Sequence, residues 1–222
     1  QSIEANVDLS FVEEGWKLEV KELSLSSNEM KLSTDFAIQS IKGTETEIAL
    51  LANLIDVDVS KIGHYLPLTL MSSHLVDYLN NALIAGNLTQ AQVLLNGPLT
   101  SFPFTDHEGI FVVDAELEKA TFQFDNQWPS IKDFSANLNF TNNSMLITGR
   151  SGSLTGLDVN GVQAAIDNLD HKQTLVLNTI INATPASTIK RLMSQSPLKN
   201  SVGVVLEQLN LSGDINGEFN LT

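Results

Sequence analysis

Histidine residues are the first candidates for metal binding or acid–base chemistry in this sequence. The four histidines are His64, His74, His107 and His171; their separations fit no metal-ligand spacing, and no HExxH motif is present. A zinc ion usually needs three or four convergent His, Cys or carboxylate ligands. Cysteine is absent, which also removes disulfides and thiolate nucleophiles. We therefore expect neither a metal centre nor a cofactor.

Two short acidic motifs are candidate sites. Asp56-Val57-Asp58 is similar to the opening of a calcium loop, but Lys61 stands where glycine is needed and Pro67 where the bidentate glutamate belongs. Asp106-His107-Glu108 lies between a proline and a glycine, which favours an exposed turn over a titrating cluster. There is also no GxSxG motif and no glycine-rich phosphate loop. We expect a protein without catalytic residues.

Composition further narrows the functional classes to which the protein can belong. Twelve Lys and Arg against 26 Asp and Glu give a net charge of −14, which disfavours nucleic-acid binding. With 42% hydrophobic and 17% charged residues, the chain should fold. The longest apolar run, 48–55, is interrupted by Asn53 and is too short to span a bilayer. Because the sequence starts at Gln1 without methionine or signal features, we interpret it as a fragment of a longer chain.

The dominant pattern is alternation of apolar and polar residues, which is typical of strands with one dry and one wet face. Repeated clean alternation favours an antiparallel sheet, since parallel strands buried on both faces are apolar throughout. The alternating residues are Ala5, Val7, Leu9 and Phe11; Trp16, Leu18 and Val20; Phe111, Val113, Ala115 and Leu117; Phe122 and Phe124; Phe134, Ala136, Leu138 and Phe140; Leu175, Leu177, Thr179 and Ile181; and Leu209, Leu211, Ile215, Phe219 and Leu221.

Three segments have helical spacing instead. The first is predicted over about 73–85, with Gly86 as a left-handed stop. The second is predicted over about 188–194, with Ser187 as its cap. The third is predicted over about 197–206, with Ser196 as the cap before a proline at the first helical position. Its buried residues are expected to be Leu198, Val202, Val205 and Leu206.

The order of strands followed by helix occurs twice. We therefore predict two units, 1–99 and 100–222, the first containing helix 73–85 and the second the other two helices. A shift of 116 residues places Val93, Leu95, Gly97 and Leu99 on Leu209, Leu211, Gly213 and Ile215. Long-period repetition favours an array of similar units that extends past this segment.

A longer ordered string of residues carries a family resemblance. It comprises Tyr65-Leu66-Pro67, Asp77-Tyr78-Leu79, Ala82-Leu83, Gly86, Leu94-Leu95-Asn96-Gly97-Pro98-Leu99, Phe102-Pro103-Phe104, Gly109-Ile110-Phe111, Ala120-Thr121-Phe122, Trp128-Pro129 and Leu138-Asn139-Phe140. This string resembles the central region of the YhdP-type, AsmA-like proteins of Gram-negative bacteria. The likeness is strongest over about 60–150 and weakest before Leu50.

The resemblance implies a fold and a function. Such proteins are anchored in the inner membrane and cross the periplasm as repeating β-groove modules, and they are associated with phospholipid transport towards the outer membrane. It implies a periplasmic segment whose partners are phospholipid acyl chains, with membranes contacted by other parts of the full-length protein. The resemblance identifies no catalytic residue and no individual lipid contact in this sequence. It also leaves the oligomeric state open.

The alternation permits two arrangements. About three short helices cannot cover the apolar face of so many strands, so the sheet either closes as a sandwich or curls into a trough that leaves room for acyl chains. A compact protein of this mass exposes roughly 10,000 Å², and an open trough more. We therefore predict a mainly β fold, a curved antiparallel sheet of repeating β-groove type with about three short α-helices. The candidate groove-lining residues are Phe111, Val113, Phe122, Phe124, Leu138, Phe140, Leu177, Leu211 and Phe219, which an ordinary sandwich core would use equally well.

Three functions remain open from the residues. The first is a segment of a hydrophobic lipid conduit. The second is a binding or scaffolding module of the cell envelope with a closed β-sandwich core. The third is a carbohydrate-active enzyme, which would need two carboxylates about 5–9.5 Å apart across a cleft.

Overall fold

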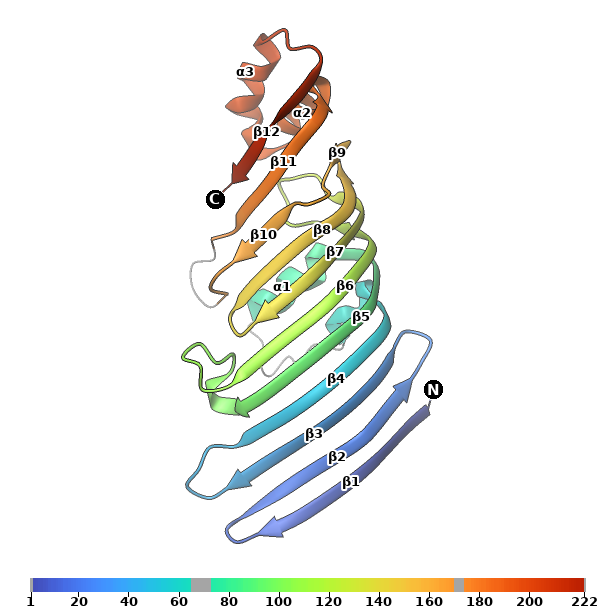
Figure 1. Cartoon of the computed structure of the whole chain (residues 1–222), viewed down its shortest axis with the longest axis vertical. Helices are drawn as coiled ribbons and strands as arrows, with labels where there is room; N and C mark the ends of the chain where they lie inside the picture. The colour runs from blue at the N-terminus through green and yellow to red at the C-terminus, as the bar shows by residue number, and fades with distance from the viewer. Residues whose placement is uncertain (1, 65–72, 170–173, 222) are drawn as a thin grey trace.

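The computed structural model describes residues 2–64, 73–169 and 174–221, with side chains described except at 64 and 73–75. These residues form one open antiparallel sheet of 12 strands, in which each strand pairs with its neighbours in the chain and β9 pairs with β8 off the main path (Figure 1). The mainly β, antiparallel fold predicted from alternation is confirmed, together with three α-helices among the described residues.

The strands are β1 (Ser2–Val12), β2 (Gly15–Ser26), β3 (Lys31–Ile41), β4 (Glu47–Asp58), β5 (Leu83–Pro98), β6 (Ile110–Phe122), β7 (Ile131–Thr141), β8 (Ser144–Leu154), β9 (Leu157–Asp158), β10 (Gln163–Ile166), β11 (Val176–Pro185) and β12 (Asp214–Leu221). The helices are η1 (Val59–His64), α1 (Ser73–Ala82), η2 (Leu99–Ser101), α2 (Ala186–Ser194), η3 (Pro197–Asn200) and α3 (Val202–Gln208).

The strand register places apolar side chains on one face of the sheet, here called the inner face. One row on this face crosses all eleven strands of the path, and every member is apolar. The row is Ile3, Leu25, Leu32, Leu54, Ala91, Ala115, Leu138, Ile147, Ala164, Leu177 and Leu221. With about 4.8 Å between strands, this inner row extends roughly 48 Å across the sheet.

The adjacent row on the outer face is polar except at Ile55. The row is Ser2, Ser26, Lys31, Ile55, Gln90, Glu116, Asn137, Thr148, Gln163, Asn178 and Asn220. Because successive side chains on a strand point to opposite faces, this contrast follows directly from the alternation in the sequence.

Bulges bend the sheet at several strands. Residues with positive φ stand at register shifts in β2, β6 and β11, where the extra residue leaves its backbone N–H without a strand partner. In each case a side chain on the neighbouring strand accepts that N–H. The three pairs are Glu22 with Asp35 Oδ1 (2.6 Å), Lys119 with Ser135 Oγ (3.3 Å) and Ala183 with Asn216 Oδ1 (2.8 Å). Bulges increase local twist and curvature, which accounts for the curled ribbon.

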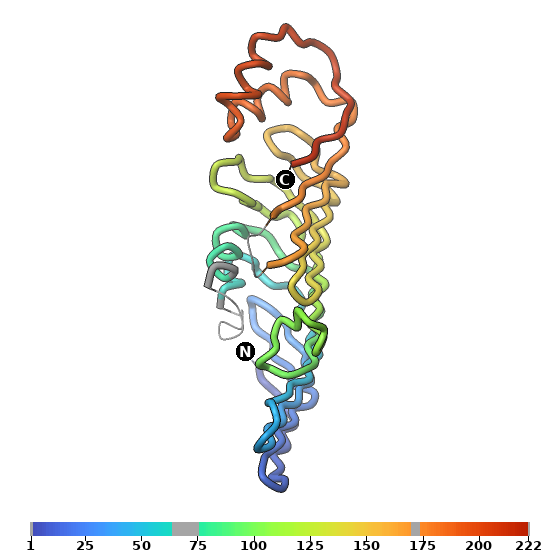
Figure 2. The backbone as a smooth tube through the Cα atoms, turned by 90° about the vertical axis from the view of Figure 1, so that its left-hand side faces the viewer, coloured from blue at the N-terminus to red at the C-terminus, as the bar shows by residue number. Residues whose placement is uncertain are grey.

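The helical segments lie on one side of the sheet, above the inner face (Figure 2). Helix α1 ends at Ala82, three residues earlier than predicted, and β5 starts at once with the buried Leu83. Gly86 therefore does not stop the helix. It lies in β5 with φ +126°, and a Cβ at this position would stand 2.6 Å from the Cα of Ala120. The glycine is needed for close approach of β6.

The C-terminal helices also differ from the prediction in detail. Helix α2 begins at Ala186, directly after Pro185, so Ser187 is inside the helix and is not its cap. Ser196 does cap the next turn, accepting the N–H of Leu198 at 3.1 Å, but that turn is the short η3 and α3 starts separately at Val202. Val202 and Val205, expected to be buried, are 43% and 57% exposed.

The final strand starts later than its alternation predicts. Residues 209–213 are irregular, and β12 begins at Asp214, so Leu211 lies in a loop and is 40% exposed. Val93 and Leu95, by contrast, lie within β5. The 116-residue alignment is therefore wrong at Leu209 and Leu211. The division into units 1–99 and 100–222 stays a prediction, because the sheet continues through both.

The accessible surface is 12926 Å². This exceeds the roughly 10,000 Å² expected for a compact protein of this mass, which agrees with an open sheet. Buried residues concentrate at β4–β8, under the helices, whereas β1 has none. Its inner-face residues Val7, Leu9 and Phe11 are 64%, 54% and 81% exposed.

Candidate functional site

The middle of the inner face forms an apolar floor that is covered only in part. Its side chains come from the central positions of β2 to β7, between the helical segments at one end of the strands and the 99–109 loop at the other. All of them are half-buried: Leu18, Phe36, Ile38, Ile48, Leu50, Val93, Val113, Leu138 and Phe140. A continuous, partly exposed apolar surface of this kind can bind hydrocarbon.

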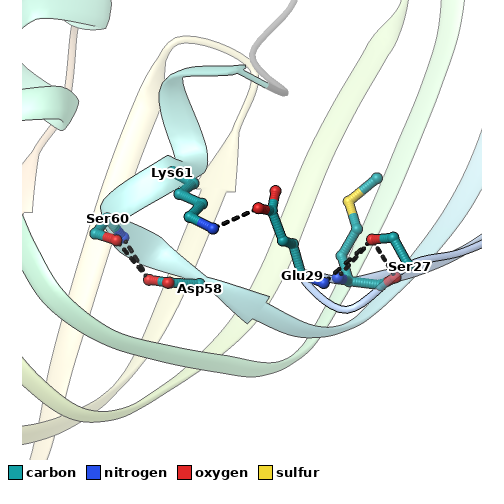
Figure 3. A network of polar contacts seen from close by, with 6 residues as sticks. Ser27, Glu29, Asp58, Ser60 and Lys61 are labelled. Atoms are coloured by element: carbon teal, nitrogen blue, oxygen red, sulfur yellow. Dashed lines mark hydrogen bonds and ion pairs between the residues drawn. The ribbon is translucent and has the colours of Figure 1, made fainter. Parts of the chain in front are cut away.

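The η1 segment is held over one end of the strands by polar contacts (Figure 3). Asp58 accepts the Ser60 hydroxyl at 2.7 Å and the Ser60 N–H at 3.0 Å, and these bonds lower the pKa of the Asp58 carboxyl. Lys61 forms an ion pair with Glu29 in the β2–β3 turn. The Ser27 hydroxyl accepts the N–H of Glu29 and of Met30, each at 3.2 Å, which closes that turn.

Helix α1 packs its apolar side on the same end of the inner face. Tyr78 and Leu79 contact the buried core, and Ala82 is fully buried. Burial raises the pKa of the Tyr78 hydroxyl to about 12, with a further contribution from the negative charge of Asp125. Tyr78 therefore remains neutral over the physiological range.

The η1 segment and α1 form the first cover of the inner face, and the loop after β6 forms the second. The chain leaves the sheet at Gln123, whose side-chain amide donates to the carbonyl oxygens of Asp125 and Trp128 at 2.5 and 2.6 Å. This closed turn brings the rings of Phe124 and Trp128 to 5.8 Å between centroids. Both rings then face the apolar space under α2.

The loop over residues 99–109 covers the opposite end of β5 and β6. Phe104 is fully buried against Gly97 and Gly109, where a Cβ would meet its ring at 2.9 and 2.7 Å. Phe102 stacks edge-on against Phe111 with 5.1 Å between ring centroids. Both glycines are thus required for this loop to seat on the sheet.

The fourth cover is α2, which lies over a partly open apolar cavity of about 80 Å³. Leu192 and Met193 of α2 close it on one side, and inner-face residues of β11 and β12 close it on the other. The residues after β9 close a third side, where Gly149 leaves the space occupied by Val162. The cavity is lined by Phe124, Trp128, Ile131, Leu154, Leu157, Asp158, Val159, Val162, Leu177, Thr179, Ile181, Ile189, Leu192, Met193, Phe219 and Leu221.

The predicted lining residues fall into distinct environments. Phe124, Leu177 and Phe219 line the cavity under α2, although Phe124 comes from the loop and not from a strand as predicted. Phe122 is buried and stacks on Phe134, with 5.6 Å between ring centroids. Leu211 lies in the loop before β12, away from the inner-face rows. The remaining four, Phe111, Val113, Leu138 and Phe140, are half-buried on the inner face. Their role as lipid contacts stays a prediction.

The two acidic motifs of the sequence lie in a turn and at the end of strand β4. Asp106, His107 and Glu108 form the exposed turn that the sequence predicts. Asp56 pairs with Lys31 at 3.5 Å across β3 and β4. Within residues 2–64, 73–169 and 174–221 no cluster of three or more His, Cys, Asp or Glu could hold a metal ion. The Tyr65-Leu66-Pro67 motif and His171 lie outside the described residues.

Comparison with known proteins identifies the family of this chain. The family model "YhdP protein" matches residues 1–222. The chain belongs to the YhdP family. It is 27% identical over 207 residues to a protein of Escherichia coli K12 named "Intermembrane phospholipid transporter YhdP". That match covers 93% of this chain but only 16% of the relative's length. No solved structure matches significantly. Among the described helices, none is long and apolar enough to cross a bilayer.

Some cavity residues were not predicted as lining. Ile189, Leu192 and Met193 were expected only to pack a helix. The alternation around Val159 is limited to 157–160, and none surrounds Trp128. The available signal was Gly149 and Gly152 within a strand, because an interior strand glycine often marks close approach of another segment. A Cβ at Gly152 would stand 3.0 Å from the Val159 side chain.

Proposed function

We propose that the inner face of this chain is a segment of a hydrophobic groove that carries phospholipids between the inner and outer membranes of a Gram-negative bacterium. In this proposal the segment lies in the periplasm, and other parts of a longer, inner-membrane-anchored protein contact the membranes. The acyl chains lie on the inner face, and no catalytic residue takes part.

The apolar row across all eleven strands carries the proposal. It runs perpendicular to the strands, from Ile3 on β1 to Leu221 on β12, and the adjacent outer row is almost entirely polar. An acyl chain moved from water onto such a surface gains about 0.8 kcal/mol for each buried methylene. The printed name of the E. coli relative supports phospholipid as the class of lipid.

The scaffolding alternative is less well supported. It requires a closed β-sandwich core, whereas the described strands form one open sheet with a half-exposed apolar floor. The enzyme alternative requires two carboxylates on opposite sides of a cleft. Among the described residues, Asp114 and Glu116 share an open hollow on the outer face, but both come from the same strand, β6.

Two pairs of neighbouring residues, one pair on β6 and one on β7, provide the test. A photoreactive benzoyl-phenylalanine replaces Val113 or Phe140 on the inner face, or Val112 or Asn139 on the outer face, in the full-length protein in Gram-negative cells. After irradiation, mass spectrometry of the purified protein identifies adducts. We expect phospholipid adducts at Val113 and Phe140, and at most background levels at the two outer positions.

Equal adduct yields on both faces would contradict the proposal, because they would indicate random contact with membrane lipid. Absence of adducts at every inner position, with the protein present at normal levels, would also contradict it.

A further inference from the structure

The strongest candidate for a distinct binding site is the cavity beneath α2. It is the covered end of the apolar inner row, which enters it at Leu177 and Leu221. Its lining is apolar except for Thr179 and Asp158. Chemistry of this kind selects a hydrocarbon chain and excludes a charged headgroup.

The cavity is too small for that occupant as it stands. Its volume is about 80 Å³, whereas an engineered apolar cavity that binds benzene has a volume of about 150 Å³. Hydrocarbon can therefore enter only if part of the wall moves. The walls formed by β11 and β12 belong to the sheet, whereas the loop that carries Phe124 and Trp128, the residues after β9 and helix α2 lie outside it. Of these three, α2 belongs to a long segment whose two ends lie together, which makes it the wall best placed to move.

The segment 186–213 is built as a hinged flap. It is inserted between the paired strands β11 and β12, so its two ends lie together, joined by a hydrogen bond of 3.0 Å from the Ala186 N–H to the Gly213 carbonyl. Gly213 has φ +86° and open space around it. Lys190 on α2 donates to the Leu209 carbonyl at 2.5 Å, which ties α2 to the chain after α3. The segment can thus turn about one neck as a unit.

On the side of α2 that faces β8 and β9, the exposed Arg191 fastens the flap beside the buried side chains of Leu192 and Met193. Arg191 of α2 donates through Nε, at 3.0 Å, and through Nη2 to the carbonyl oxygen of Thr155 in the turn between β8 and β9. The guanidinium packs against Gly156, which has φ +90° and no side chain in the way. These bonds are exposed, so water can replace them when the latch opens, and the main cost of opening is the exposure of the buried Leu192 and Met193. Leu192 and Met193, exposed by opening, would be covered again by an entering chain.

We propose that the cavity beneath α2 is a binding site for one lipid hydrocarbon chain, that segment 186–213 is its lid, and that Arg191 on Thr155 is the latch. The structure corresponds to the closed lid. This inference rests on the proposed function, since it assumes that hydrocarbon moves along the inner face.

A reversible tether tests the lid, and the absence of native cysteine makes the labelling specific. The Thr155→Cys/Arg191→Cys variant of the 222-residue chain is joined by a bis-maleimide with a disulfide in its spacer. The probe is a diazirine derivative of palmitic acid, and adducts are mapped by peptide mass spectrometry. We expect tethering to reduce labelling of peptides 177–181 and 189–193 about tenfold and reductive cleavage to restore it, while labelling at 111–117 is unchanged.

Single substitutions give a second readout that does not depend on the tether. Arg191→Ala is expected to increase the rate of labelling beneath α2 several-fold. Arg150→Ala is the matched control, because it removes an arginine of β8 that pairs with Glu118 at 2.6 Å and is not part of the latch. Circular dichroism verifies that each variant is folded.

The outcomes separate the two proposals. Labelling beneath α2 that ignores the tether would overturn the lid, since the probe would then thread under a fixed helix. Labelling at 111–117 with none beneath α2 in the untethered chain would overturn this site and leave the groove intact. Absence of labelling at both places would overturn the proposed function as well.

Discussion

Single residues satisfy the backbone where the sheet bends. Ser135 is 7% exposed and serves two neighbours: its Oγ accepts the N–H of the bulged Lys119 at 3.3 Å and donates to Glu118 Oε2 at 2.7 Å. Glu118 in turn pairs with Arg150 at 2.6 Å. The bulge between β6 and β7 therefore depends on one hydroxyl.

Replacing that hydroxyl should have a measurable cost. We expect Ser135→Ala to lower the free energy of unfolding by about 1–2 kcal/mol, because the Lys119 N–H loses its acceptor in a partly buried position. Urea denaturation followed by circular dichroism measures the change. Ser151→Ala is the control, since Ser151 is paired in register with Ser135 but is exposed, and it should stay within about 0.5 kcal/mol of the parent. Equal effects of the two substitutions would show that the bulge does not need Ser135.

Sequence pattern was informative for residues in strands and misleading just beyond them. Val113, Leu138 and Phe140 lie on the inner face as their alternation predicts. Phe124 and Leu211 continue the same alternation but lie in loops. A period of two only records which side an extended residue faces, so it cannot indicate where the chain leaves the sheet. At Gln123 that departure is set by the side-chain bonds to Asp125 and Trp128, which no local apolar pattern encodes.

At the scale of elements, α2 and β11 form two walls of the cavity beneath α2. A larger side chain in this cavity should raise the free energy of unfolding and lower the binding of hydrocarbon. We expect Thr179→Leu to raise the free energy of unfolding by about 0.5–1.5 kcal/mol, because the larger side chain buries apolar area in empty space. Labelling beneath α2 by the photoreactive fatty acid should fall in the same variant. Thermal melts and adduct mapping measure the two effects.

Ile180→Leu is the matched control for that substitution. Ile180 is the next residue of β11, faces outward and is 64% exposed, so neither stability nor labelling should change. A Thr179→Leu variant with unchanged labelling would contradict the assignment of the cavity as a hydrocarbon site.

The existence of most elements followed from the sequence, whereas their ends did not. The helix around 73–85 was expected from its apolar stripe, yet it stops at Ala82 because Leu83 is drawn into pairing with Phe122. Likewise the third predicted helix divides at Ser201 into η3 and α3. Tertiary pairing and burial decide such boundaries, and a single sequence does not contain the position of the neighbouring strand.

At the scale of the whole molecule, charge and apolar surface are separated. The net charge of −14 belongs to a chain whose inner row has no charged member. Apolar burial should thus dominate lipid uptake, and electrostatic attraction should contribute little.

Salt dependence checks this separation. We expect uptake of a fluorescent zwitterionic phospholipid from neutral vesicles to change by less than about twofold as salt rises from about 0.01 to 0.1 M, although the Debye length falls from about 30 to 10 Å. Vesicles containing anionic lipid are the control, from which uptake should increase with salt as repulsion is screened. Strong suppression of neutral-lipid uptake by salt would point to a charged headgroup site instead.

Pairing of each strand with its sequence neighbours makes the length of the molecule adjustable. In such a sheet a hairpin can be gained or lost without changing the partners of strands elsewhere, apart from the two that flank it. Each added hairpin would lengthen the ribbon by roughly 10 Å, at about 4.8 Å a strand, with the same cross-section. Under the proposed function, the number of strands, rather than any particular side chain, would set the length of the groove.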